Sequence, residues 1–290
     1  DAAGNAMTST TVPSTPNNIA DAEAIVIDTT APTVSSFTST TANGSYKAGD
    51  EINITANTSE AIVSGNTITV IIDTGDEVVL TAAADGTTLV GTYTVGAGDT
   101  SGDLNVNSFT IGTVVDAAGN AMTSTTLPNN NNIGDNEAIV IDTTAPATPT
   151  IGSAADTATI TPTITGTAEV SSSVTVTFTD DNGVPISYTA TAAAVGGAWS
   201  VDTSTADTSG TTPALVDGNS YTVSVSATDA AGNTSAVSAT QTLNVDTTVP
   251  TVISFTSTAV DGSYTVDDTI NITATTSEAI VSGNTITVKL

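Results

Sequence analysis

Acidic side chains recur at fixed places along this chain of 290 residues, and the chemistry open to them is the binding of a hard cation. The pentapeptide DAAGN, which begins with an aspartate and ends with an asparagine, occurs three times, at 1–5, 116–120 and 229–233. A further aspartate stands in each of three related DTT segments, at Asp28, Asp142 and Asp246. Ca²⁺ takes about six to eight oxygen ligands from carboxylates, amides and water, whereas Mg²⁺ demands tighter octahedral geometry. The oxygen-rich pattern therefore favours calcium.

The composition excludes several other kinds of chemistry. The chain has 30 acidic residues against two basic ones, Lys47 and Lys289, and it has no His and no Cys. Without Cys or His there is no thiolate zinc site, no cysteine nucleophile and no Ser-His-Asp triad. A net charge of −28 excludes nucleic acid and anionic membrane surfaces as partners, because both are bound through cationic groups. No apolar run approaches the ~18 residues of a membrane span, so we expect no direct membrane insertion. An acidic, solvated surface that maintains solubility is the alternative interpretation of the charge.

The positions of these carboxylates depend on β-strands. Alternating segments such as INITANT and YTVSVSAT place one residue type on each face and are rich in the β-branched residues that strands favour. Turn signals such as Asn43-Gly44 and Asp85-Gly86 separate these segments. Between the first two DTT segments we predict strands near 33–40, 51–58, 66–73, 77–83, 88–95, 104–115 and 137–142. About seven short strands in ~100 residues are typical of an immunoglobulin-like β-sandwich, an all-β fold.

Internal repeats divide the chain into four parts. EAIVIDTTAP occurs at 23–32 and again, with the same letters, at 137–146, and 251–290 closely repeats 33–72. The linker aspartates lie 114 and 104 residues apart (142 minus 28 and 246 minus 142), so two unit types alternate as A, B, A. We therefore expect complete domains of type A and type B at 29–142 and 143–246. We expect partial type A domains at 1–28 and 247–290, in a segment of a longer protein.

Strand direction predicts that carboxylates far apart in the sequence meet at one end of each domain. In an antiparallel sandwich the loops after the second and sixth strands both lie beside the linker that enters the domain. In unit A these places hold Asp28 of the linker, Glu60 of TSEAI, and Asp116 with Asn120 of DAAGN. The corresponding residues are Asp142, Glu169, Asp229 and Asn233 in unit B, and Asp246, Glu278, Asp1 and Asn5 in the partial domains.

Converging carboxylates repel one another, and two lysines cannot neutralise 30 acidic groups. We therefore predict a bound Ca²⁺ at each such domain end. The alternative for DAAGN is a plain Asx turn with a left-handed glycine, which needs no metal.

Two weaker acidic clusters extend this prediction. Asp99 and Asp103 follow the fifth strand, at the far end of unit A near Asp142. They offer further ligands to the next junction, or they belong to a plain solvated loop. Asp135 precedes the seventh strand, which we expect to begin near Asp28, so it is a further candidate ligand there.

DTTAP in the linkers, GTAEV and ATDAAGN together resemble the bacterial immunoglobulin-like, or cadherin-like, tandem repeats of giant calcium-binding surface adhesins and biofilm-associated proteins. The resemblance covers essentially the whole chain. It implies calcium-stiffened domains arranged as an elongated rod, in a secreted protein on the bacterial cell surface. The ligands that it implies are Asp28, Glu60 and Asp116, followed by Asp142, Glu169 and Asp229. Unit B departs from the pattern, since it has GTAEV where many relatives have GTAEP, and this puts the shape of its loop in doubt.

These features predict a structural extender segment of an adhesin, in which Ca²⁺ at the inter-domain junctions rigidifies the rod for cell adhesion or biofilm formation. The expected partners are neighbouring repeats of the same chain and, through other domains, a host or neighbouring cell surface or matrix. The alternatives are a subunit of an extracellular filament, sheath or surface layer, and a direct glycan-binding module, although aromatic residues make up only 3% of the chain. An enzyme is not expected, because every carboxylate cluster lies at a domain end rather than in a cleft.

Overall fold

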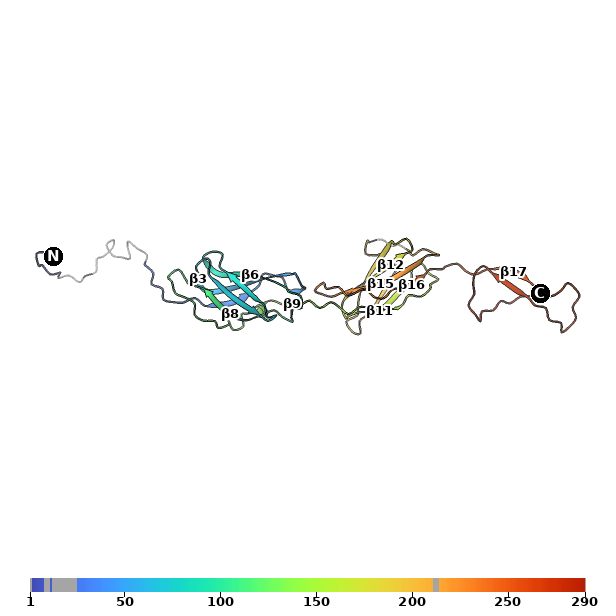
Figure 1. Ribbon diagram of the computed structural model, residues 1–290, viewed down its shortest axis with the longest axis horizontal. Coiled ribbons are helices and arrows are strands. Elements are labelled where there is room, and N and C mark those ends of the chain that lie inside the picture. Colours follow the sequence, from blue (N-terminus) through green and yellow to red (C-terminus); the bar gives the residue numbers. More distant parts are fainter. Residues whose placement is uncertain (1, 8–10, 12–24, 211–213, 290) are drawn as a thin grey trace. The chain divides into compact units, whose positions relative to one another are not determined.

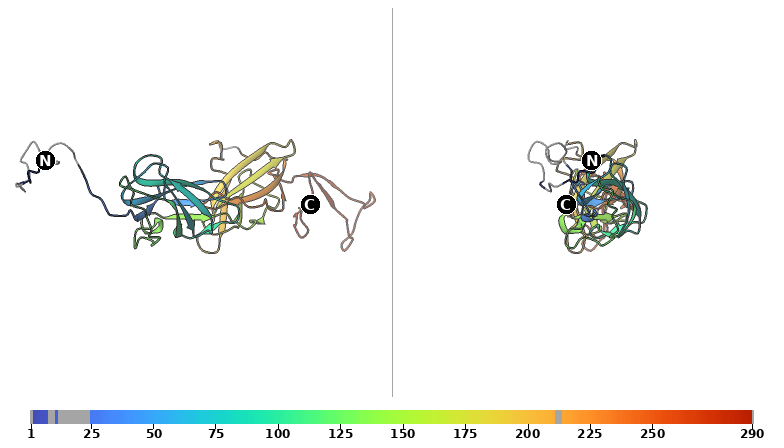
Figure 2. Two further views of the ribbon diagram at one scale, coloured as in Figure 1. Left: turned by 60° about the vertical axis from the view of Figure 1, so that its left-hand side comes forward. Right: turned by 90° about the vertical axis from the view of Figure 1, so that its left-hand side faces the viewer.

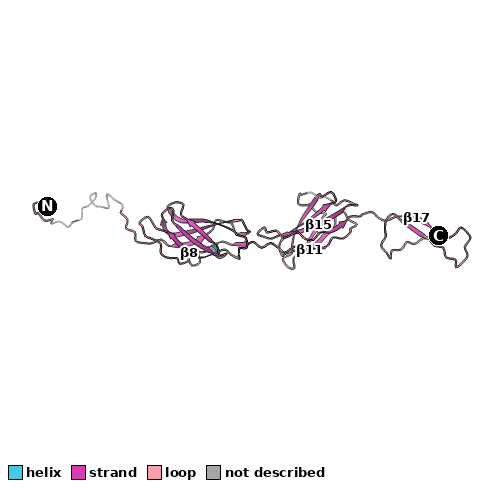
Figure 3. Cartoon of the chain, viewed as in Figure 1, coloured by secondary structure: helices cyan, strands magenta, loops and turns pink. Residues whose placement is uncertain are grey.

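The structure is a computed structural model that describes residues 2–7, 11, 25–210 and 214–289 (Figure 1). These residues form 18 strands and one helix of four residues (Figure 3), which confirms the all-β class. The chain divides into two compact units, each described by itself below: unit 1 (Asp1–Thr144 with Ala230–Asn233) and unit 2 (Ala145–Asp229 with Thr234–Leu290). The finer division into four domains stays a prediction.

Unit 1 contains all the strands that the sequence predicts for 29–142, together with three short elements that it does not predict. The elements in chain order are β1 (Val34–Thr38), β2 (Gly44–Tyr46), β3 (Glu51–Ile62), β4 (Thr67–Ile72), β5 (Glu77–Thr81), β6 (Gly86–Thr94), β7 (Thr100–Ser101), β8 (Val106–Thr113), α2 (Ile133–Asn136) and β9 (Ile139–Asp142). The elements that pattern alone misses are β2, β7 and α2. They have two to four residues each, which is too short for an apolar period to be visible.

Two sheets surround the core of unit 1. The larger has the order β1-β3-β6-β5-β4-β8, and the smaller has the order β2-β9-β7. A single residue pair, Thr81 with Val90, joins β5 to β6. The larger sheet therefore consists of two antiparallel leaves, β1-β3-β6 and β5-β4-β8. In the smaller sheet β2 and β9 run parallel.

Strict alternation along the strands builds this core. In β3 the side chains of Ile52, Ile54 and Ala56 are fully buried, while the residues between them are partly exposed. Successive side chains of a strand point to opposite faces, so this pattern turns one face of the leaf inward. Phe37 of β1 meets Phe109 of β8 edge to face, with ring centroids 5.7 Å apart. The two leaves thus share one apolar interior.

Strands β3 and β8 finish side by side at one end of unit 1. Ile62 pairs with Asp116, and the Val63 N–H donates to the Val115 carbonyl oxygen at 3.0 Å. The chain then turns and runs back along β8. Its Met122 N–H donates to the Val114 carbonyl oxygen at the near end (2.9 Å), and the Asn132 amide donates to the Val106 carbonyl oxygen at the far end (2.8 Å). Consequently α2 and β9 begin at the end of β8 opposite to the DAAGN turn.

Unit 2 contains two sheets packed face to face around one core, and its strands are the yellow and orange ones in the left-hand view of Figure 2. The sheets have the orders β10-β11-β14 and β13-β12-β15-β16. The strands are β10 (Thr150–Ser153), β11 (Thr163–Thr167), β12 (Ser173–Asp180), β13 (Pro185–Thr191), β14 (Ala198–Asp202), β15 (Ser220–Thr228) and β16 (Gln241–Asn244). A separate two-stranded sheet contains β17 (Val252–Thr256) and β18 (Thr273–Thr276).

The core of unit 2 depends on a close contact between a tryptophan in β14 and the backbone of the neighbouring strand β11. Trp199 of β14 is buried, with 3% of its surface exposed. Its partner across the sheet is Gly166 of β11. A Cβ atom at Gly166 would overlap both the indole ring and the Thr150 carbonyl oxygen. Because backbone atoms cannot give way as the end of a flexible side chain can, only glycine fits here.

We predict that Gly166→Ala destabilises unit 2 by about 1–3 kcal/mol, the usual cost of forcing extra volume into a packed interior. Denaturant unfolding followed by Trp199 fluorescence measures it. Gly262→Ala is the matched control, since a Cβ there meets no atom within 4 Å. Equal stability of the two variants would contradict the account of the core.

Candidate metal centre

The DAAGN turn positions the first carboxylate, that of Asp116. Its Oδ1 accepts hydrogen bonds from the N–H groups of Ala118 and Asn120, both at 2.8 Å. Its Oδ2 accepts one from the Asn120 side-chain amide, also at 2.8 Å. Gly119 has φ +92°, a left-handed conformation that glycine adopts without strain. The Asx turn proposed as the alternative interpretation of DAAGN is therefore present in the structure.

The second carboxylate is that of Glu60, which lies near the end of β3. Pairing between β3 and β6 is irregular here, because the register shifts between Asn57 and Ile62. The Thr58 hydroxyl donates to the Glu60 carbonyl oxygen at 2.7 Å. The sequence predicted a loop at this place, and this was wrong: Glu60 belongs to β3, whose irregularity turns the strand end toward Asp116. Thr58 was missed, although the same Thr-x-Glu spacing recurs at Thr276 and Glu278.

The third carboxylate, that of Asp28, comes from the linker. Its Oδ1 accepts a hydrogen bond from the Thr30 N–H at 2.9 Å, and its backbone carbonyl oxygen accepts one from the Asn120 side-chain amide at 3.2 Å. The next copy repeats both contacts. The Thr144 N–H donates to Asp142 Oδ1 at 2.9 Å, and the Asn233 amide donates to the Asp142 carbonyl oxygen at 2.8 Å. The asparagine that closes DAAGN thus ties the turn to the linker, and it does so as a donor.

Asp28, Glu60 and Asp116 each place one carboxylate oxygen within 4.8 Å of the other two. Among the described residues this is the one acidic set with that spacing. The three line an open hollow of about 450 Å³, together with Val26, Ala61, Ala117 and Ala118. Asp116 is buried, Glu60 is half-buried and Asp28 is exposed. The sequence-based prediction that these three residues converge is confirmed.

Glu60 is the residue whose environment points most directly to a ligand. Its Oε1 is buried and accepts no hydrogen bond. Burial raises the pKa of its carboxyl group, and the negative charges of Asp28 and Asp116 raise it further. The Asp116 pKa is lowered instead, chiefly by the Asn120 side-chain amide and also by backbone N–H groups of the turn. An unpaired buried oxygen beside two carboxylates is costly unless a cation accompanies it.

A second turn in the same chain, DDNG, has similar hydrogen bonds but no acidic set, so it shows what the turn does without neighbouring carboxylates. In DDNG, Asp180 Oδ1 accepts hydrogen bonds from the N–H groups of Asn182 (3.0 Å) and Val184 (2.9 Å). Gly183 has φ +79°, close to that of Gly119. The pKa of Asp180 is likewise lowered, mainly by the Val184 N–H. Asp180 belongs to no acidic set of the described chain, so the turn forms without converging carboxylates.

The donor set fits a hard divalent cation. Three carboxylates supply three to six oxygens, depending on whether each binds through one atom or two, and water completes the shell of Ca²⁺. The hollow is open, its lining contains no lysine, and Asp28 in that lining is exposed. Asp28, Glu60 and Asp116 are thus the residues that would hold the ion, while Asn120 orients two of them.

The other predicted ligands differ in how far the structure supports them. Asp142 belongs to unit 1, whereas Glu169 and Asp229 belong to unit 2, so that triad stays a prediction. Glu278 reproduces the state of Glu60: its Oε1 is buried without a partner, and the Thr276 hydroxyl donates to its carbonyl oxygen at 2.7 Å. Asp246 Oδ1 accepts from the Thr248 N–H at 3.0 Å, as the other linker aspartates do.

Asp1 lies outside the described residues. Asn5 is described and exposed, after Gly4 at φ +83°.

Asp99 lies near Asp142, as predicted, because β7 pairs with β9 through Thr100 and Asp142. Asp103 lies further along β9, where the Leu104 N–H donates to the Ile139 carbonyl oxygen at 2.8 Å. The Asp99 carboxylate is engaged within its own loop, where it accepts from the Tyr93 hydroxyl and the Gly96 N–H, both at 2.6 Å. These hydrogen bonds favour the alternative of a structural loop at Asp99.

Asp135 does not lie beside Asp28, and that prediction was wrong. Its carboxylate accepts from the Asn132 N–H at 2.8 Å and completes the capping box of α2. The neighbouring Gly134 N–H donates to Asn105 Oδ1 at 2.9 Å, next to the start of β8. Asp116 follows the other end of β8, roughly 30 Å away at ~3.3 Å per residue. The long return of the chain along β8 carries Asp135 to the opposite end.

Comparison with known proteins gives no match, either to a family model or to a curated protein. No helix of the described chain is long and apolar enough to cross a membrane. The geometry of the site is therefore the basis for the function proposed below.

We predict that Glu60→Gln separates two effects on stability: the destabilisation caused by the crowded negative charges, and the stabilisation given by bound Ca²⁺. In a chelator the variant has a melting temperature equal to or above that of the parent, because it removes a charge that burial and two carboxylates disfavour. On addition of Ca²⁺ the parent is stabilised and the variant is not. Scanning calorimetry measures both, with Glu77→Gln, at an exposed position of β5, as control. A Ca²⁺ response that survives Glu60→Gln would rule out Glu60 as a ligand.

Protons should compete with the cation at Glu60. Because the Glu60 pKa lies above its ordinary value of 4.5, this carboxyl group is neutralised first as the pH falls. The ordinary value for Asp116 is 3.8 and the site lowers it, so Asp116 stays ionised at a pH that protonates Glu60. We predict that Ca²⁺ affinity begins to fall while the pH is still above 4.5. Calorimetric titrations at a series of pH values test this, and constant affinity down to pH 4.5 would contradict it.

Proposed function

We propose that the protein is a structural extender segment of a secreted bacterial surface adhesin, in which Ca²⁺ stiffens the junctions between tandem immunoglobulin-like domains. One observation carries this proposal. The acidic set combines Asp28, a linker residue, with Glu60 and Asp116, which belong to two strand ends of the following sandwich. A cation bound by all three fixes the linker to that sandwich.

The immunoglobulin-like assignment is supported by strand order. Both units have a leaf of three strands, β1-β3-β6 in one and β10-β11-β14 in the other, formed by corresponding strands in the chain. Both also have a parallel contact near the last strand, β2 with β9 and Thr157 with Val245. Two antiparallel layers around one core in about 100 residues are the hallmark of this architecture.

Stiffening follows from the loss of freedom in a short linker. Without a cation, three like charges repel, and Asp28 of the linker is held to the turn by the hydrogen bond from the Asn120 amide. With a cation the linker gains bonds to two strands. Extracellular calcium modules bind with dissociation constants of about 10⁻⁴ to 10⁻³ M, so millimolar Ca²⁺ outside a cell occupies about half or more of such sites. The proposal assigns no catalytic activity.

A subunit of an extracellular filament or sheath is the second candidate function. Defined assemblies in electron micrographs of the purified chain would support this candidate, and a monodisperse monomer in solution would oppose it.

We predict that Ca²⁺ stiffens the full chain and that Asp28 is required for a share of this effect. Small-angle scattering in about 5–10 mM Ca²⁺, well above the expected dissociation constants, gives a larger maximum dimension and less flexibility than in chelator. If the dissociation constant is about 10⁻³ M, 10 mM Ca²⁺ stabilises unit 1 by roughly 1.4 kcal/mol.

Asp28→Asn should reduce both effects, whereas Asp180→Asn, which alters a similar turn without an acidic set, should leave them intact. Scattering profiles and melting curves that are the same in calcium and in chelator would refute the proposed function.

A further inference from the structure

The first residue after the last strand of unit 1 is still attached to that sandwich. This residue is Thr143, which follows Asp142 of β9. Its hydroxyl donates to the Asp99 carbonyl oxygen at 3.0 Å and accepts from the Gly98 N–H at 3.2 Å. Both partners belong to the loop between β6 and β7. The start of the linker is therefore hydrogen-bonded, through one side chain, to the sandwich that it leaves.

Unit 2 holds the same linker position through different atoms. Thr247 follows Asp246 as Thr143 follows Asp142, and the Thr247 N–H donates to Asp217 Oδ1 at 2.7 Å. This hydrogen bond is the main cause of the lowered pKa of Asp217. Asp217 lies in the connection that leads to β15, and the loop that holds Thr143 lies in the connection that leads to β8. Since β8 and β15 both precede DAAGN, corresponding connections contact the linker in the two units.

A buried tyrosine anchors each of these loops to its own core. The Tyr93 hydroxyl donates to Asp99 Oδ2 at 2.6 Å, in the residue whose carbonyl oxygen contacts the linker. The Tyr221 hydroxyl accepts from the N–H of Val216, next to Asp217, at 2.9 Å. Both tyrosines are buried, and a buried tyrosine brings its hydroxyl to a fixed partner. Hydrogen bonds to these loops therefore connect the start of the linker to the packed interior.

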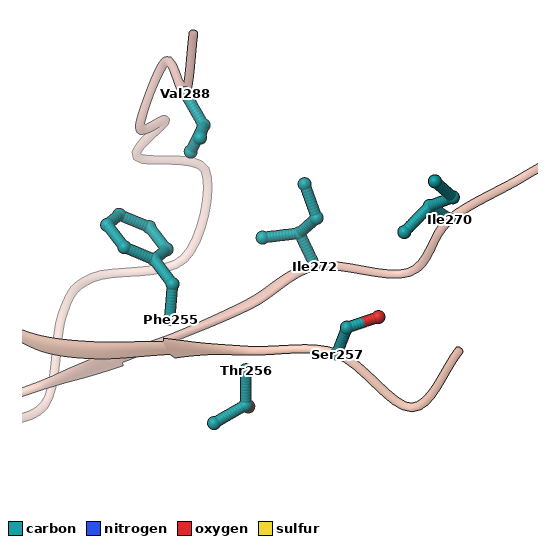
Figure 4. A pocket seen from close by; sticks show the side chains of 6 residues that line it. All are labelled: Phe255, Thr256, Ser257, Ile270, Ile272 and Val288. Carbon is teal, nitrogen blue, oxygen red and sulfur yellow. The ribbon is translucent and has the colours of Figure 1, made fainter. Parts of the chain in front are cut away.

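Few residues separate each held threonine from the next strand. After Thr143, residues 144–149 lead to β10. After Thr247, residues 248–251 lead to β17. With β18, this strand forms a sheet whose apolar side chains lie on one side, with Phe255 among them (Figure 4). Holding the threonine therefore shortens a part of the chain that is already brief.

We propose that Thr143 and Asp217 are positioning residues, which fix the start of each linker to the sandwich that the chain leaves. This role rests on the proposed function, in which Asp142 and Asp246 bind Ca²⁺ at the entrance to the following domain. Each of these aspartates directly precedes a held threonine, so it is ordered before a cation arrives. A ligand that is already ordered loses less conformational freedom on binding. The cation then connects two packed domains instead of tying a loose linker to one.

Thr143→Val tests this role in unit 1, because valine has the same branched shape and lacks the hydroxyl that makes both hydrogen bonds. In chelator we expect the Gly98 amide of the full chain to exchange about tenfold faster, the factor for one lost hydrogen bond. The ¹⁵N order parameter of residue 143 should fall from about 0.85, typical of rigid backbone, toward about 0.6. Thr144→Val is the matched control, since Thr144 is exposed and bonds to Asp142 through its backbone N–H, which valine retains.

Asp217→Ala is the corresponding test in unit 2, where it should speed exchange of the Thr247 amide. Asp181→Ala, at another exposed aspartate, should leave that exchange unchanged. The proposal is overturned if either test variant behaves as its control does, or if residue 143 of the parent already has an order parameter below about 0.6 in chelator. A held linker in the parent, without any response of the scattering profile to Ca²⁺, would support the positioning role and refute the proposed function alone.

Discussion

Repulsion among three carboxylates at the entrance to unit 1 is the constraint on which the account of this protein depends. Asp28, Glu60 and Asp116 approach within 4.8 Å although their hollow contains no cationic side chain. The fold enforces the approach. β3 and β8 end together, the DAAGN turn locks Asp116 with three hydrogen bonds to its carboxylate, and the Asn120 amide holds the linker carbonyl of Asp28. A cation is the partner that such an arrangement needs.

The turn and the metal are complementary rather than competing explanations of DAAGN. Asp180 forms nearly the same turn without any acidic set, so the hydrogen bonds and the left-handed glycine are sufficient for the turn itself. Those hydrogen bonds also keep Asp116 ionised, since they lower its pKa. The turn therefore prepares Asp116 as a proposed ligand, whereas Glu60, with its unpartnered buried oxygen, would gain most from a bound ion.

Much of this arrangement can be predicted from the sequence, because its signals are local. Alternation of apolar residues identified the strands that form the leaves, and the chain direction through β3 and β8 brought Glu60 and Asp116 to the linker.

The position of Asp135 could not be predicted in this way. The segment after DAAGN has no apolar period, and only its contacts with Val114 and Val106 show that it returns along β8. The parallel pairing of β2 with β9 joins residues about a hundred positions apart, which no local pattern encodes. The role of Asn120 as donor depends on which way its amide faces, and residue type does not determine this.

The most direct test is a crystal structure of the chain grown with Ca²⁺ and analysed by anomalous scattering. The account predicts one calcium ion within about 2.3–2.6 Å of carboxylate oxygens from Asp28, Glu60 and Asp116, with Glu60 Oε1 among its ligands. An ion that is absent from this place in millimolar Ca²⁺, or one that is bound without Asp28, would contradict the claim that calcium joins the linker to the sandwich.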